Sequence, residues 1–174
     1  LEVEMATLVT RELRGLGVCV HAGVAAQSIV HGDDHDSVTL SDGTVLTADV
    51  IVLSTGVRPD TAFAEAAGIE TSRGYILVDE HGRTSADDIY AVGDAAVGRD
   101  HDRPVALAGP ANRGGRLVAD AIADAEHGKA TARPIPSPQG TAIVRIGSLT
   151  AAMTGANRQA LDASGTKYFT VHTH

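Results

Sequence analysis

Two glycine-containing strand ends hold the residues best suited to binding a ligand. The first is Ser54-Thr55-Gly56-Val57-Arg58-Pro59, which completes the apolar run 49–54. The second is the segment 84–95, which ends in Ile-Tyr-Ala-Val-Gly93-Asp94-Ala95. A glycine at the end of a buried parallel strand lets the backbone approach a ligand closely. Asp94 can accept a hydrogen bond from a ligand hydroxyl, although glycine and aspartate are also common in ordinary turns.

The two segments together resemble a known family. A Thr-Gly-x-Arg-Pro junction, followed about 30 residues later by Thr-Ser and then Ile-Tyr-Ala-Val-Gly-Asp, is similar to the FAD-dependent pyridine nucleotide-disulfide oxidoreductases. The resemblance implies that Gly93-Asp94, continued by Ala95, ends the last strand of an FAD domain and that Asp94 binds the ribityl chain. It also implies that Thr55 and Gly56 lie where an NAD domain returns to the FAD domain, near the nicotinamide.

The stretch Leu107-Ala108-Gly109-Pro110-Ala111-Asn112-Arg113-Gly114-Gly115-Arg116 resembles the helix that follows in this family. The resemblance implies that backbone N–H groups at Leu107, Ala108 and Gly109 face the pyrimidine side of the flavin ring. Physical chemistry agrees with that role, because free N–H groups and the positive end of a helix dipole stabilise the negative charge of a reduced flavin.

The C-terminal residues resemble one subgroup. Segments 140–145 and 149–155 are similar to the dimerisation domain of the CoA-disulfide reductases, NADH oxidases and NADH peroxidases. The expected fold class is therefore α/β, with parts of Rossmann-like domains followed by the start of an α+β domain. We expect residues 1–55 to end an NAD(P)-binding domain, 56–133 to end an FAD-binding domain, and 134–174 to begin the dimerisation domain of a homodimer.

Several features of the family are not visible in this sequence. No Gly-x-Gly-x-x-Gly phosphate-binding motif occurs, and Gly15-Leu16-Gly17 does not qualify because position 20 is Val. The redox cysteine expected early in the FAD domain is also missing, so no catalytic residue is assigned. The sequence starts in a helical pattern and stops in a strand pattern, which predicts a fragment. We expect the isolated fragment to show no turnover, since hydride transfer requires both rings to be held together.

Composition narrows the functional classes. The 174 residues carry a formal charge of −8, which disfavours nucleic-acid binding because a negative protein repels phosphates. No apolar run approaches the roughly 20 residues of a membrane span, and no signal peptide is visible. One cysteine, Cys19, excludes an internal disulfide framework and a cysteine-based zinc site. The expectation is a soluble cytoplasmic protein that acts on small molecules.

The elements that would position these residues follow from hydrophobic periodicity and turn signals. Helices are predicted at the N-terminus up to Gly15, and at 61–67, 110–127 and 157–164. An antiparallel meander is predicted at 26–30, 37–40 and 45–47. Further strands are predicted at 18–21, 49–54, 75–78, 89–92, 141–146 and 168–171, and the proline-containing segment 129–140 is predicted to be a linker. Cys19 is predicted to be an inert buried thiol. The segment 31–35, with its two histidines, is predicted to be a polar turn and not a metal site.

Three functions remain in competition. The first is a flavoenzyme that passes electrons from NAD(P)H through FAD to a disulfide such as CoA disulfide, to dioxygen or to peroxide. The second keeps both cofactors but reduces a ferredoxin or rubredoxin. The third is a non-catalytic dimerisation or interaction module descended from such an enzyme. The sequence does not discriminate NADH from NADPH, because the selective residue would follow a glycine motif that is not seen here.

Overall fold

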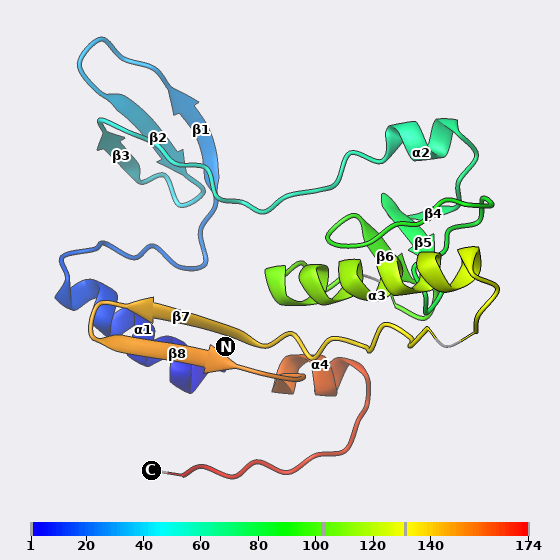
Figure 1. Ribbon diagram of the computed structural model, residues 1–174. Coiled ribbons are helices and arrows are strands. Elements are labelled where there is room, and N and C mark those ends of the chain that lie inside the picture. The colour runs from blue at the N-terminus through cyan, green and yellow to red at the C-terminus, as the bar shows by residue number, and fades with distance from the viewer. Residues whose placement is uncertain (1, 102–103, 131, 174) are drawn as a thin grey trace. The chain divides into compact units, whose positions relative to one another are not determined.

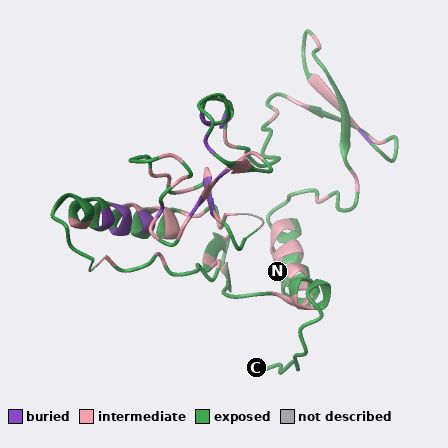
Figure 2. Ribbon diagram, turned by 90° about the vertical axis from the view of Figure 1, so that its right-hand side faces the viewer, coloured by how far each residue is buried: buried purple, intermediate pink, exposed green. Residues whose placement is uncertain are grey.

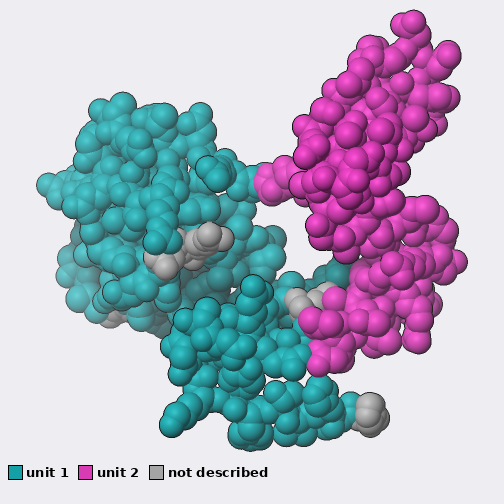
Figure 3. All heavy atoms as spheres, turned by 180° about the vertical axis from the view of Figure 1, so that it is seen from behind, with its two compact units in different colours: residues 1–2, 57–144, 150–174 teal, residues 3–56, 145–149 magenta. Residues whose placement is uncertain are grey.

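The computed structural model describes residues 2–101, 104–130 and 132–173 (Figure 1). Its elements divide between two compact units, coloured separately in Figure 3. One unit comprises residues 1–2, 57–144 and 150–174, and we call it the helix α3 unit. The other comprises residues 3–56 and 145–149, and we call it the meander unit. Each is described by itself.

The meander unit begins with α1 (Val3–Gly15), whose apolar residues recur at helical spacing. Gly17, at φ +84°, ends this helix in a Schellman motif, in which the Val18 N–H donates to the Leu13 carbonyl at 3.0 Å. Three antiparallel strands follow: β1 (Ala26–Val30), β2 (Asp36–Leu40) and β3 (Val45–Ala48). The predicted N-terminal helix and meander are confirmed.

The helix α3 unit contains a small mixed sheet in the order β4-β5-β6. Its strands are β4 (Thr71–Ser72), β5 (Tyr75–Val78) and β6 (Ala96–Gly98), and β5 pairs in parallel with β6. Helix α2 (Ala62–Ala66) precedes the sheet and α3 (Ala108–Glu126) follows it. A buried cluster joins α2 to the sheet through Ala64, Ile69, Ile76, Val78 and Ala96.

Helix α3 packs through one face, which contains the buried residues Gly114, Leu117, Val118 and Ala121 (Figure 2). Close packing extends to Gly82, where an added Cβ would lie 2.5 Å from Val118 Cγ2. Gly82 also has φ +78°, a backbone conformation that residues with a side chain rarely adopt. Both the close contact and the backbone conformation therefore require glycine at this position.

The C-terminal part contains a two-stranded sheet, β7 (Ala142–Ile146) and β8 (Leu149–Met153), and the short helix α4 (Arg158–Ala163). Asn157 caps α4, because its side-chain oxygen accepts the Ala160 N–H at 2.9 Å. The predicted strand at 141–146 and helix at 157–164 are therefore confirmed to within a residue or so.

Four predicted strands are wrong. Segments 18–21, 49–54 and 168–171 have no strand structure, and segment 89–92 forms only an isolated bridge between Tyr90 and Arg83. A strand requires a hydrogen-bonded neighbour, and no described segment forms a ladder with the runs 18–21, 49–54 and 168–171. The run 89–92 is bonded to residues 82–84 over too short a length to count as a strand. The side chains of Val50 and Val52 are accordingly 76% and 81% exposed. Cys19, in the first of these runs, is exposed and not buried as predicted.

No helix within the described residues is long and apolar enough to cross a membrane.

Candidate functional site

The predicted ligand-binding residues Gly93, Asp94 and Ala95 form a tight turn between Val92 and β6. Gly93 has φ +85°, and its carbonyl accepts the Ala96 N–H at 3.2 Å. The Ala95 carbonyl accepts the Ile76 N–H at 2.9 Å, which fixes the turn to β5. The Asp94 side chain is exposed. The backbone of the turn is therefore hydrogen-bonded both internally and to β5, and the turn presents one carboxylate to solvent.

The turn packs against the first turns of α3. An added Cβ on Gly93 would lie 3.7 Å from the Ala111 Cβ, and one on Gly114 would lie 2.6 Å from Val92 Cγ2. A contact that short is available only to a residue without a side chain. The structure thus brings together two of the segments that the sequence singled out, the Gly-Asp turn and the start of the following helix.

The N-terminus of α3 is open. Its N-cap residue is Leu107, in extended conformation at φ −138° and ψ 146°, and no side chain caps the helix. The first N–H groups of a helix have no hydrogen-bond partner within the helix. Pro110 has no backbone N–H group and so cannot act as a donor. The Leu107 N–H, one of the three predicted donors, is not available, because it donates to the Val105 carbonyl at 2.8 Å. Among the described residues no partner is seen for the N–H groups of Ala108 and Gly109, and the first turn has no acidic residue. Such an end favours an anion or a polarised carbonyl.

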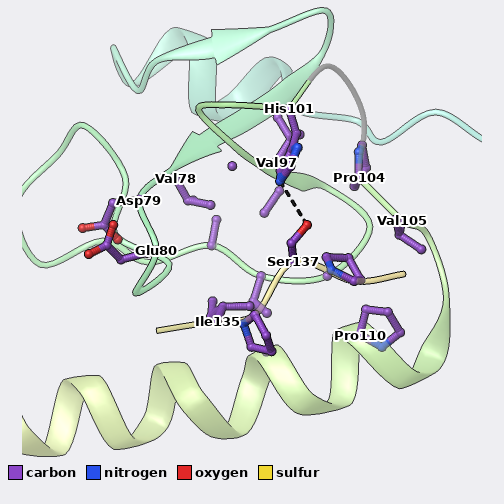
Figure 4. Close-up of a pocket in the computed structure, with 18 of the residues that line it drawn as sticks. Val78, Asp79, Glu80, Val97, His101, Pro104, Val105, Pro110, Ile135 and Ser137 are labelled. Atoms are coloured by element: carbon purple, nitrogen blue, oxygen red, sulfur yellow. Dashed lines mark hydrogen bonds between the residues drawn. The ribbon is translucent and has the colours of Figure 1, made fainter. Parts of the chain in front are cut away.

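A cavity of about 510 Å³ adjoins the turn (Figure 4). Its lining includes Gly93 and the α3 residues Pro110, Ala111 and Gly114, whereas Asp94, Ala95 and residues 107–109 lie outside it. Apolar and polar side chains share the walls; those labelled in Figure 4 are Val78, Asp79, Glu80, Val97, His101, Pro104, Val105, Pro110, Ile135 and Ser137.

The proline-containing segment supplies one wall of the cavity. The Ile135 N–H donates to the Glu80 carbonyl at 2.7 Å, and Ser137 Oγ lies 3.4 Å from His101 Nε2. Sequence reasoning assigned residues 129–140 to a linker and missed this contribution. The only available signal was the apolar Ile135 between two prolines.

The other predicted binding residues, Thr55 and Gly56, belong to the meander unit. Both are exposed, and Gly56 has φ +95° with open space where a Cβ would be. Within the described residues, no group of three or more histidine, cysteine, aspartate or glutamate side chains is placed to hold a metal ion.

The turn and the helix end fit a flavin nucleotide. The ribityl chain offers hydroxyls, for which the exposed Asp94 carboxylate is an acceptor. The flavin ring gains negative charge on reduction, for which the free N–H groups of α3 are donors. Gly93 leaves space where a Cβ would stand, apart from its contact with Ala111. These residues therefore match the group that the sequence resemblance implies.

Comparison with protein families finds one that covers most of the chain. The sequence pattern described as pyridine nucleotide-disulphide oxidoreductase matches residues 1–125. That range includes the Gly-Asp turn and nearly all of α3, and it leaves out the β7–β8 sheet and α4.

Curated relatives include electron-transfer reductases. The rubredoxin-NAD(+) reductase of Alcanivorax borkumensis is 43% identical over 116 residues, which are 66% of this chain and 30% of that protein. The nitrite reductase (NADH) large subunit of Escherichia coli is 31% identical over 120 residues, 67% of this chain and 14% of that protein. The chain thus spans less than a third of these relatives.

Solved structures match nearly the whole chain. A NAD-dependent persulfide reductase from A. fulgidus superposes with a TM-score of 0.86 at 34% identity, covering 97% of this chain and 31% of that one. Reduced CoADR-RHD from Bacillus anthracis gives a TM-score of 0.85 at 31% identity, covering 96% and 30%. The predicted α/β class, with parts of Rossmann-like nucleotide-binding domains, is confirmed.

Proposed function

This chain belongs to the pyridine nucleotide-disulphide oxidoreductase family, and on that premise we propose that it is part of an FAD-dependent enzyme that oxidises NAD(P)H. Enzymes of this family use FAD and NAD(P)H. Because the chain spans about 30% of its relatives, we propose that further nucleotide-binding segments act with it. Residues 1–55, 56–133 and 134–174 would then be parts of the NAD(P)-binding, FAD-binding and dimerisation domains.

One observation supports this proposal most strongly: the Gly93–Ala95 turn is packed on the open N-terminus of α3. Asp94 would hold ribityl hydroxyls, and the N–H groups of Ala108 and Gly109 would face the pyrimidine side of the ring, after Leu107 at the N-cap. Thr55 and Gly56 would lie near the nicotinamide. We propose no catalytic side chain within this chain.

Bound FAD would supply the redox chemistry, by taking up a hydride equivalent from NAD(P)H and passing electrons to an acceptor. The contribution of this chain is electrostatic and positional. The helix end would stabilise negative charge on the ring, and the Asp94 carboxylate, carried by a hydrogen-bonded turn, would orient the ribityl chain. The hydrogen bond from the Ile76 N–H to the Ala95 carbonyl ties the backbone next to Asp94 to β5.

For the acceptor we propose the disulfide and persulfide class, with dioxygen or peroxide as related acceptors. The two structures named above, a persulfide reductase and CoADR-RHD, match 97% and 96% of the chain, so the likeness extends through β7, β8 and α4. A second candidate is a rubredoxin or ferredoxin, and the 43% identity to a rubredoxin-NAD(+) reductase favours it.

The experiment is a turnover assay of the full-length protein that carries this chain. NADH or NADPH oxidation would be followed with CoA disulfide, a persulfide, dioxygen, peroxide and rubredoxin as separate acceptors. Faster turnover with the sulfur compounds would support the first proposal, and faster turnover with rubredoxin would replace it by the second. If the purified full-length protein contains no flavin and shows no turnover, both enzyme proposals are wrong, and the third function, a non-catalytic dimerisation or interaction module, replaces them.

We further propose that the full-length protein is a cytoplasmic homodimer, since segments 140–145 and 149–155 resemble the dimerisation domain of the CoA-disulfide reductase subgroup. Gel filtration with light scattering tests the dimer, and a monomer would contradict it.

A further inference from the structure

Glu12 on α1 and Ser148 in the β7–β8 turn make a double contact. One carboxylate oxygen of Glu12, Oε1, accepts both the backbone N–H and the hydroxyl of Ser148, each at 2.8 Å. The two residues are 136 positions apart in sequence, and both belong to the meander unit. A side chain thus holds the tip of a hairpin that is distant along the chain.

The hairpin tip lies tightly against the helix. Gly147 has φ +55°, and an added Cβ there would lie 2.5 Å from Glu12 Oε1 and 3.0 Å from Leu16 Cδ1. Within the hairpin turn, Arg145 Nε donates to the Gly147 carbonyl at 3.3 Å. The glycine therefore leaves room for the Glu12 carboxylate, which lies beside the hairpin tip at an exposed site.

We propose that Glu12, Gly147 and Ser148 form a proton-controlled clasp that holds the β7–β8 tip on α1 and releases it when Glu12 is protonated. A carboxylate only accepts hydrogen bonds, and bonds to an ionised acceptor are the stronger ones. Protonation removes the charge that both donors of Ser148 share. The clasp is closed at neutral pH and opens in acid.

The direction of the pH response follows from the donors. The Ser148 N–H and then its hydroxyl hold the pKa of Glu12 below its usual value, and Arg11 on the same helix acts in the same sense. Arg145 is the charged group on the hairpin beside the contact. A lowered folded pKa means that the clasp contributes fully above the unfolded pKa and is lost as pH falls through the folded pKa.

The test uses the whole 174-residue chain and the NMR signal of the Ser148 amide proton. We expect this signal to titrate with a midpoint below the ordinary glutamate value, and the titration to disappear in Glu12→Gln, which keeps an acceptor oxygen but takes up no proton. The charge-matched control is Glu126→Gln at the exposed end of α3, in which the titration should persist. An unchanged titration in Glu12→Gln would overturn the proposal.

Trypsin provides a second measurement at neutral pH, because Arg145 precedes the tip. Cleavage after Arg145, followed by mass spectrometry, should be severalfold faster in Glu12→Ala than in the wild type or in Glu126→Ala. If Glu12→Ala does not fold, Ser148→Ala removes only the hydroxyl donor, and the midpoint of the amide signal at position 148 should then move up toward the ordinary value. Equal cleavage rates in folded variants, or an unmoved midpoint, would contradict the clasp.

Discussion

Gly114 of α3 lies so close to Val92 that a methyl group on its α-carbon would come within 2.6 Å of Val92 Cγ2. Val92 immediately precedes the Gly93–Ala95 turn, so this contact sets the spacing between the turn and the helix whose N-terminus we propose to face the flavin. The neighbouring Gly115 has open space at the same position. The two adjacent glycines therefore serve as a natural pair for comparison.

Gly114→Ala should lower the free energy of unfolding by about 1–3 kcal/mol, because overpacking forces the helix away from a β-branched side chain that is stiff at χ1. Gly115→Ala should instead raise it by about 0.5–1 kcal/mol, as expected for alanine in place of glycine within a helix. Urea denaturation of both variants measures the difference. Equal effects would show that the Val92 contact does not constrain the helix.

Asp94→Ala should weaken FAD binding at least about tenfold, because a hydrogen bond to a charged group contributes about 1.5–3 kcal/mol. The measurement is flavin content after gel filtration of the full-length protein, together with FAD titration by fluorescence. Asp87→Ala is the control, since Asp87 is exposed and lies in the polar turn that precedes residues 89–94. Unchanged flavin content in Asp94→Ala would remove Asp94 from the proposed site.

Thr61→Val should lower the free energy of unfolding by about 1 kcal/mol, because the buried Thr61 hydroxyl donates to the Gly74 carbonyl at 3.0 Å and valine leaves that acceptor unpaired. Thr61→Ser keeps the donor and loses only a methyl group. Thermal or urea unfolding should therefore rank wild type, serine and valine in that order if the hydrogen bond dominates. A serine variant less stable than the valine variant would assign the effect to packing.

Asp42 should make the β2–β3 turn sensitive to acid. Its carboxylate accepts the Thr44 N–H at 2.9 Å, and this bond holds the pKa of Asp42 below its usual value. The contribution to stability is thus present above the unfolded pKa and is lost as pH falls through the folded pKa. The Thr44 amide proton should titrate in this acidic range, and Asp42→Asn should abolish that titration.

The control for this turn is Asp34→Asn, which removes the same charge from the exposed β1–β2 loop. In the Asp34→Asn variant the Thr44 amide proton should titrate as it does in the wild type. If it does not, the response reflects the overall charge of the meander unit and not the local bond.

Local signals along the chain predicted most of the helices, the meander and the strand β5. They succeed where structure depends on nearby residues: Gly17 ends α1 through its own positive φ, and Asp42-Gly43 closes a hairpin between adjacent strands. The turn at Gly93-Asp94 is likewise where the sequence placed it, followed by a helix that starts at Ala108, two residues before the predicted Pro110.

Prediction failed where structure depends on a distant partner. The run from Val50 to Leu53 has strong strand propensity, but propensity cannot supply the neighbour that a ladder requires. Within the described chain the run has no such neighbour, and three of its four side chains are exposed. The reverse holds for β6, where three small residues form a strand because β5 lies beside them. The cavity was missed for the same reason, since Ile135 lines it next to residues about 55 positions earlier, where its N–H donates to the Glu80 carbonyl.

The distance in sequence between Glu12 and Ser148 also has a consequence for biosynthesis. At elongation rates of about 5–20 residues per second, the 136 residues that follow Glu12, up to and including Ser148, take roughly 7–27 s to be made. During that interval α1 exists without the partner of its Glu12 carboxylate, and Leu16 lacks the hairpin tip beside it. The nascent chain therefore passes through a stage in which α1 is complete but the turn that contacts Glu12 has not yet been made.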